Sequence, residues 1–307
     1  MTEGSRKAII AAFLANLGIA ISKFVGFIIT GSAGMLAEAV HSVADTGNQA
    51  LLMLGGRRAT KRASPEHPFG YGRERYFWAF AVAMVLFSMG GLFALYEGFH
   101  KLRHPHEVES IWVGVTILLI AIVLESWSLR TAVKETNHIK PKSMGWFRFI
   151  RTSKQPELPV VLLEDTGAEI GLLFALFGLL MAHWTGDGRW DALGSVAIGF
   201  LLITIAIVLM VEMKGLLIGE AASATDIDAI DGAIRRSPHV EAVIHMRTEH
   251  LGPDEILLAT KVEYDSKLTF DEVADAINAT EANIRAAVPA ARLIYIEPDF
   301  KRPVVGN

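Results

Sequence analysis

Four polar side chains are spaced along the apolar segment Met35–Gly56, and their types are those that bind metal ions. The spacings of three, four and three residues place them along one stripe of a helix: Glu38, His41, Asp45 and Asn48. His41 and Asp45 can therefore point one imidazole nitrogen and one carboxylate at a single cation. Imidazole suits zinc, nickel, copper and iron, and a carboxylate extends this range toward manganese.

A second group of carboxylates lies in the apolar segment Leu158–Trp184, which holds Glu164, Asp165 and Glu169. Asp165 and Glu169 are four residues apart and share a helix face, whereas Glu164 lies about 100° round the helix from Asp165. We therefore expect that the three do not all face one point. If the two segments touch, His41, Asp45 and two of these three carboxylates could close a metal site at mid-membrane. Four nitrogen and oxygen ligands suit Zn²⁺.

An alternative interpretation gives these groups a packing role, in which they pair with Lys23, Arg130 or backbone groups. It also applies to Glu125, in the apolar segment Ile111–Ala132, because Arg130 follows five residues later. For Glu125 an ion pair and a proton relay both fit the spacing. Ionisable groups at bilayer depth cost about 2.5–3.5 kcal/mol each on insertion scales, so each needs a partner, an ion or a cavity.

The apolar residues are concentrated in the first two thirds of the chain, whose 307 residues are 51% hydrophobic. Each apolar segment is about long enough to cross a hydrocarbon core of roughly 30 Å. The six segments are Ala8–Ile29, Met35–Gly56, Phe77–Phe99, Ile111–Ala132, Leu158–Trp184 and Ala192–Val211. A helix satisfies its own backbone in lipid, so the pattern predicts six transmembrane helices. A soluble all-α protein is the alternative, and six consecutive segments of this kind are hard to bury in water.

Charge and composition exclude several classes of protein. A formal net charge of −4 gives no support for a nucleic-acid partner, and the absence of cysteine excludes disulfides, thiolate metal sites and cysteine nucleophiles. Basic residues gather in the loops after the second and fourth segments, between Arg57 and Arg75 and between Lys134 and Lys154. By the positive-inside rule these loops and both termini are cytoplasmic, in the cytoplasmic membrane if the source is bacterial.

The hydropathy pattern changes near Gly219, where a smaller domain begins. Thr225 is a candidate helix cap, and Thr269 with Glu272 matches a capping box ahead of a second helix. Three strands with alternating patterns are predicted at Val240–Arg247, Leu258–Tyr264 and Arg292–Glu297. The order αββαβ predicts a small α+β domain with its helices on one sheet face. The fold class is thus an all-α six-helix membrane bundle over residues 1–218, followed by an α+β dimerisation domain over residues 219–307.

Three stretches resemble the cation diffusion facilitator, or zinc-transporter, family: GSAGMLAEAVHSVADTGNQALLMLG, HPFGYGRER and LLEDTGAEIG. Two further stretches, VLESWSLRTAVKE and WFRFIRTSKQPELPVVLLEDTGAEIG, are similar to the zinc transporter nine subgroup. The resemblance implies a homodimeric antiporter that exports a divalent cation from the cytoplasm in exchange for protons. It also implies a ferredoxin-like tail and a transport site made by helices two and five, to which His41 and Asp45 would contribute.

The chain departs from that family pattern at three places. The helix-five pair is usually a histidine and an aspartate, and here Glu164, Asp165 and Glu169 are the only candidates. Zinc is the first expectation for the cargo, with manganese, iron and cobalt as alternatives. In the loop after helix two only His67 of a usual second metal set is present, so we expect no metal there. The tail has Tyr295 where the family often has a histidine, so it should dimerise without the usual metal cluster.

Metal ligands must give up protons, so a site of this kind couples metal binding to proton release. Two other functions use the same residues. An intramembrane metalloenzyme would activate a water molecule, but the sequence contains no separate general-base motif such as His-Glu-x-x-His, so we expect no enzyme. A transport-inactive regulatory or scaffold protein would instead recruit partners through the tail, and the absence of a helix-five histidine is compatible with it.

Overall fold

The computed structural model describes residues 3–105 and 110–301, without the side chains of residues 3–16 and 139. The chain divides into two compact units. The first comprises Met1–Gly56 and Phe77–Lys214, and the second comprises Arg57–Tyr76 and Gly215–Asn307. The loop 57–76 therefore belongs with the tail, a grouping that the sequence analysis did not predict.

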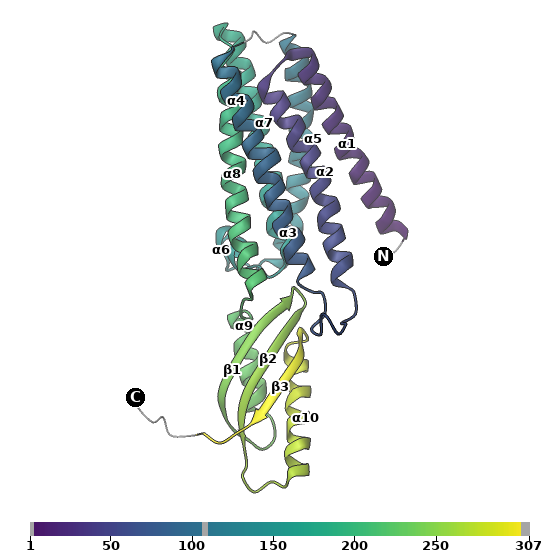
Figure 1. Ribbon diagram of the computed structural model, residues 1–307, viewed down its shortest axis with the longest axis vertical. Helices are drawn as coiled ribbons and strands as arrows, with labels where there is room; N and C mark the ends of the chain where they lie inside the picture. Colours follow the sequence, from purple (N-terminus) through teal and green to yellow (C-terminus); the bar gives the residue numbers. More distant parts are fainter. Residues whose placement is uncertain (1–2, 106–109, 302–307) are drawn as a thin grey trace, which may run out of the picture. The chain divides into compact units, whose positions relative to one another are not determined.

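Long helices run alongside one another in the first unit (Figure 1). They are α1 (Glu3–Thr30), α2 (Ala33–Ala59), α5 (Ile111–Ile139), α7 (Glu157–Thr185), α8 (Arg189–Ile218) and a continuous run of α3 (Glu74–Val85), the π-helical η1 (Leu86–Leu92) and α4 (Phe93–Arg103). The short α6 (Trp146–Thr152) lies between α5 and α7 in the chain. Each predicted span falls within one of these elements. Glu74–Arg103, Ile111–His138 and Arg189–Ile218 are long and apolar enough to cross a membrane by length and composition alone.

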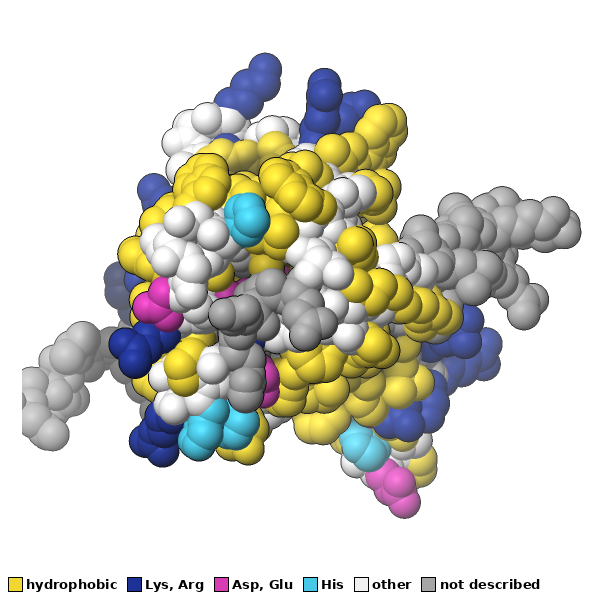
Figure 2. Space-filling model, turned by 90° about the horizontal axis from the view of Figure 1, so that it is seen from above, with side chains coloured by type: hydrophobic (Ala, Val, Ile, Leu, Met, Phe, Trp, Pro, Cys, Tyr) yellow, Lys and Arg dark blue, Asp and Glu magenta, His cyan; other side chains and the backbone are white. Residues whose placement is uncertain are grey.

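Large apolar side chains point outward from the bundle. Those exposed by more than half include Ile28 at 77%, Val123 at 67% and Phe200 at 57%. Figure 2, a view from above, shows hydrophobic side chains over much of the visible face. Contiguous exposed apolar surface of this kind is unfavourable in water and favourable against lipid. The surface therefore fits the multi-pass membrane protein that the hydropathy predicts.

Small residues let the helices approach one another closely. A Cβ built on Gly34 of α2 would lie 3.3 Å from Ala175 Cα of α7. A Cβ on Gly199 of α8 would lie 2.8 Å from the backbone nitrogen of Leu95 in α4. Glycine and alanine at such contacts are typical of helices that pack in a membrane. The packing brings the polar stripe of α2 against α7.

A buried carboxylate ties together three chain segments at one end of the bundle. Asp191, at the start of α8, accepts hydrogen bonds from Ser32 Oγ at 2.5 Å and from the Ala33 backbone nitrogen at 2.7 Å. Its other partner is the buried Lys101 of α4, with Nζ at 3.0 Å from Oδ2, and the same ammonium donates to the carbonyl of Gly31. The negative charge also lies at the N-terminus of α2, where the helix dipole favours it.

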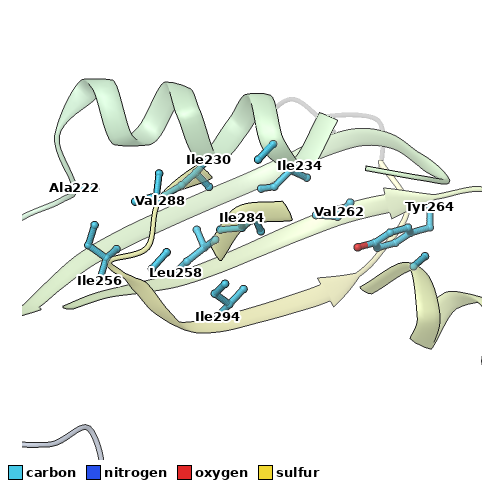
Figure 3. Close-up of a cluster of buried hydrophobic side chains, with 13 residues drawn as sticks. Ala222, Ile230, Ile234, Ile256, Leu258, Val262, Tyr264, Ile284, Val288 and Ile294 are labelled. Atoms are coloured by element: carbon cyan, nitrogen blue, oxygen red, sulfur yellow. The ribbon is translucent and has the colours of Figure 1, made fainter. Parts of the chain in front are cut away.

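The second unit has the predicted order αββαβ. Its elements are α9 (Ala224–Arg235), β1 (Val240–Gly252), β2 (Glu255–Tyr264), α10 (Phe270–Ala287) and β3 (Ala291–Pro298). The sheet order is β1-β2-β3, with β1 antiparallel and β3 parallel to β2. Both helices pack on one sheet face over a core that includes Ile230, Leu258, Ile284 and Ile294 (Figure 3).

The helix caps of this unit match the sequence prediction at one helix and differ at the other. Thr269 and Glu272 form the expected capping box at α10. Helix α9 begins earlier than predicted, because its cap is Ser223, whose side chain accepts from the backbone nitrogen of Asp226. Thr225 consequently lies inside the first turn. Ser223 offers the same kind of hydroxyl acceptor as Thr225, so residue type alone did not distinguish them.

The loop 57–76 packs on the turn between β1 and β2. A Cβ built on Gly72 would lie 2.6 Å from the carbonyl oxygen of Leu251, so only glycine allows this approach. Arg73 pairs with Glu249, and Arg75 Nη1 lies 2.9 Å from Asp254 Oδ2. These contacts explain why the basic loop groups with the tail.

Candidate metal site between the second and fifth long helices

The polar stripe on α2 is buried as predicted, but its members have different partners. Glu38, His41 and Asn48 are fully buried, and the side chain of Asp45 is 17% exposed. Glu38 Oε2 accepts from Lys23 Nζ of α1 at 3.0 Å, and the same ammonium donates to Ser42 Oγ at 2.8 Å. For Glu38 the packing interpretation therefore holds.

His41 and Asp45 carry buried polar atoms without hydrogen-bond partners among the described residues. Both ring nitrogens of His41 and the Oδ1 of Asp45 are in this state. His41 Nε2 lies 3.5 Å from Asp45 Oδ2, which is close for an ion pair and long for a hydrogen bond. Buried polar groups are normally satisfied, and those that are not call for a missing partner such as an ion. Both residues are thus available as ligands.

The carboxylates of α7 turn toward two different neighbouring helices. Glu164 is buried and accepts from Asn48 Nδ2 of α2 at 2.5 Å. Glu164 and Asp45 also line the same small pocket. Asp165 accepts from Ser128 Oγ of α5 at 2.9 Å, and Glu169 accepts from Ser126 Oγ at 2.9 Å.

A small pocket lies where these side chains meet. Its volume is about 40 Å³, which is a few times the space that one water molecule needs. The lining residues come from α1, α2, α5 and α7: Ile19, Ser42, Asp45, Gln49, Glu125, Ser128, Val161, Glu164 and Asp165. Carboxylate, hydroxyl and amide oxygens are the polar groups of this lining.

The structure brings together some of the predicted ligands and leaves others apart. Asp45, Glu164 and Asp165 line the pocket, although Glu164 and Asp165 are about 100° apart on their helix. Both reach it because the pocket extends between α2 on one side of α7 and α5 on the other. His41 is not part of the lining and lies beside Asp45. Glu169 is not part of the lining either, and its Oε2 is buried without a hydrogen-bond partner among the described residues.

In the part of the chain that the structure describes, no group of three or more His, Asp or Glu side chains is arranged to hold a metal ion as it stands. The described carboxylates are near one another but do not converge on one point. Carboxylates repel one another in the absence of a cation, and a divalent ion would draw them together. The arrangement is therefore an acidic pocket that side-chain rotation could close around a cation.

Gln49 and Glu125 are among the lining residues that were not predicted as ligands. Gln49 lies four residues after Asp45, so its position on the helix stripe could have indicated it. Glu125 was considered with Arg130, but no ion pair joins the two among the described residues. The spacing within α5 does not reveal which helix Glu125 faces, so only the packing of the helices shows it.

Comparison with known proteins finds a matching family model and several similar proteins. A family model described as the cation efflux transmembrane domain matches residues 9–218. The human proton-coupled zinc antiporter SLC30A9, named as mitochondrial, is 30% identical over 267 residues, which are 87% of this chain and 47% of that protein. Metal tolerance protein C4 of Arabidopsis thaliana is 26% identical over 267 residues, 87% of this chain and 58% of that protein. The chain thus spans about half the length of these relatives.

A bacterial relative matches over a larger share of its own length. The magnetosome protein MamB of a Magnetospira strain is 25% identical over 289 residues, which are 93% of this chain and 92% of that protein. Among solved structures, the nickel form of a MamM CTD variant is matched with a TM-score of 0.25 and 19% identity, over 26% of this chain and 100% of that chain.

Proposed function

The chain belongs to the cation efflux family, a family of transporters and not of enzymes, and on this premise we propose that it is a proton-coupled antiporter that exports a divalent metal cation. The observation that carries the proposal is the acidic pocket in the bundle, lined by Asp45, Glu164 and Asp165. Carboxylates at that depth are costly unless they serve an ion, a partner or a cavity.

In this proposal the cation is held by Asp45, Glu164 and Asp165, with His41 as the single nitrogen ligand. The position of His41 beside Asp45, with both ring nitrogens unpartnered among the described residues, supports this assignment. The ligand role predicted for Glu169 stays a prediction. Zinc is the first candidate for the cargo, because a relative is named as a zinc antiporter. Manganese, iron and cobalt are the alternatives.

Proton coupling follows from two carboxyl groups that share one pocket. Asp45 and Glu164 both line it, and two carboxyl groups in a buried pocket repel each other unless one of them carries a proton. A divalent cation favours both groups in their ionised form, so its arrival expels that proton. Reprotonation on the opposite side of the membrane would release the metal. Rocking of the helices around the pocket would alternate the access.

The orientation and assembly complete the proposal. From the basic loops and the positive-inside rule we propose that both termini and the α+β domain are cytoplasmic. We propose that two copies associate through the α+β domain, because a domain of this size gains stability from a partner. Lipid, the divalent cation and protons are then the other partners of the chain.

A transport-inactive scaffold is the second candidate, and one observation favours it. Within the described residues no set of three ligands is arranged for a metal. A vesicle experiment separates the two functions. Purified protein is reconstituted into liposomes, a pH gradient is imposed, and the entry of Zn²⁺ and of Mn²⁺ is followed with an internal dye. An antiporter gives gradient-dependent flux that His41→Ala and Asp45→Asn each abolish. Flux that is absent, or that both variants retain, contradicts the proposed antiporter.

A further inference from the structure

One carboxylate in the pocket has no role in the proposed function. Glu125, on α5, lines the pocket together with Asp45, Glu164 and Asp165. It is near enough to each of these three carboxylates to repel it. The pocket thus gathers four acidic groups from three helices, and nothing in the two-helix site explains the fourth.

The packing of α5 holds Glu125 at this place. Ser128 of the same helix donates to Asp165 at 2.9 Å, and Ser126 donates to Glu169 at 2.9 Å, so two hydrogen bonds fix α5 against α7. Glu125 and Ser128 are three residues apart and therefore lie on the same side of α5. Both line the pocket. The carboxylate of Glu125 faces the pocket because the helix is held in this rotation.

The available cations do not account for the charge of Glu125. No described residue forms an ion pair with it, including Arg130. The buried ammonium of Lys23 attracts it from a distance but is bonded to Glu38 and Ser42. Beside the pocket, the imidazole of His41 and the Oδ1 of Asp45 are buried without hydrogen-bond partners in the described ranges. The four carboxyl groups gathered in the pocket and these open ligand atoms both point to a bound cation.

We propose that Glu125 is a direct ligand of the transported cation, so that α2, α5 and α7 together hold it. The proposal rests on the proposed function and adds a third helix and a selectivity to it. With Glu125 the pocket offers four carboxylates as well as the hydroxyls of Ser42 and Ser128 and the amide of Gln49. Such oxygen-rich surroundings suit Mn²⁺, which accepts six oxygen ligands. Zn²⁺ is satisfied by four ligands and can use His41.

Glu125 therefore sets how well the site accepts an oxygen-preferring cation. Zn²⁺ can complete a tetrahedron from His41, Asp45 and the two acids of α7 without it. Mn²⁺ needs more oxygen ligands, so without the Glu125 carboxylate it lacks a ligand that it cannot replace. Removing the charge of Glu125 should weaken Mn²⁺ binding more than Zn²⁺ binding, and so change the ratio of the two affinities.

The test measures Mn²⁺ and Zn²⁺ affinities by calorimetry on the purified full-length protein, with flux in liposomes as a second readout. The variant is Glu125→Gln, which keeps the shape of the side chain, and Glu135→Gln, at an exposed position on the same helix, is the matched control. Size-exclusion profiles check that each variant folds. We expect Glu125→Gln to lower the Mn²⁺ affinity by at least about tenfold, the size that even indirect metal partners contribute, and to lower the Zn²⁺ affinity by less. Glu135→Gln should change neither.

Each other outcome overturns something specific. If the wild type binds metal and Glu125→Gln leaves both affinities unchanged, Glu125 is not a ligand. If Glu125→Gln keeps both affinities and loses flux, Glu125 carries protons, which also contradicts the ligand assignment. An equal loss for both metals would refute the selectivity. If the wild type neither binds nor moves either metal, the proposed function itself fails, and the assignment of Glu125 fails with it. A Glu125→Asp variant that folds and recovers Mn²⁺ binding would support the role of the carboxylate.

Discussion

Replacing Lys23 by methionine should destabilise the bundle strongly, because the ammonium group is the partner of a fully buried carboxylate. Lys23 Nζ and Glu38 Oε2 are 3.0 Å apart, and both side chains are 0% exposed. Lys23 also donates to Ser42 at 2.8 Å. Methionine has a similar length, so the change removes the charge and two hydrogen bonds and leaves little empty space.

The loss of stability in Lys23→Met depends on the buried Glu38 carboxylate, which stays without its partner. Breaking a buried pair leaves one uncompensated charge and typically costs about 3–5 kcal/mol. Glu38 can reduce this cost by taking up a proton, so we expect the lower end, about 3 kcal/mol. For a domain of this size about 2–4 °C is lost per kcal/mol, which predicts a fall in melting temperature of about 6–12 °C. Replacing both partners should cost much less, because no buried charge is left.

The assay is the thermal unfolding of the detergent-purified protein, followed by tryptophan fluorescence. Lys23→Met, Glu38→Gln and the double variant form a cycle, and the surface pair of Arg235 and Asp231 is the control because its side chains are 55% and 34% exposed. We expect the double variant to be more stable than Lys23→Met alone. Additive losses, with the double variant the least stable of the three, would refute the reasoning that an unpaired buried charge causes the effect.

Two further predictions concern the end of the bundle and the α+β domain. Asp191→Asn removes the charge that joins the starts of α2 and α8 to the end of α4, so it should lower the melting temperature by several degrees; an unchanged value would show that the shared hydrogen bonds contribute little. The backbone nitrogen and then the hydroxyl of Thr269 donate to Glu272 and lower the pKa of that carboxyl from its ordinary 4.5. Its stabilising contribution is therefore complete above pH 4.5 and is lost as the pH falls through the lower value of the folded state. Hydrogen exchange at the start of α10 should accelerate in acid for the wild type, and Glu272→Gln should remove this dependence; a pH profile that is identical in the two would contradict it.

Patterns along one helix or strand were enough to predict the elements. Each predicted span lies in a long helix because lipid selects for an apolar segment of fixed length. The alternation of residues such as Leu258 and Val262 identified the strands, since one sheet face covers the core. The capping box at Thr269 was predictable because its partner lies three residues away.

Relations between elements were not predictable from the same patterns. Glu164 and Asp165 differ by about 100° on their helix, so periodicity separated them, but neighbours on both sides let each reach the pocket. Glu125 was ambiguous because its partner depends on the rotation of α5 against α7. The docking of Gly72 on the turn after β1 depends on a backbone approach between distant segments, for which the sequence holds no local signal.

Proton release on metal binding is the most direct test of the central claim, that a divalent cation replaces protons in a pocket formed by Asp45, Glu164 and Asp165. Zn²⁺ is added to the purified protein in weakly buffered solution, and the protons released per bound ion are measured with an indicator dye. We predict release in the wild type and a smaller release per bound ion in Asp45→Asn, which lacks one acid of the pair. Metal binding without proton release, or release that Asp45→Asn leaves unchanged, would contradict the account.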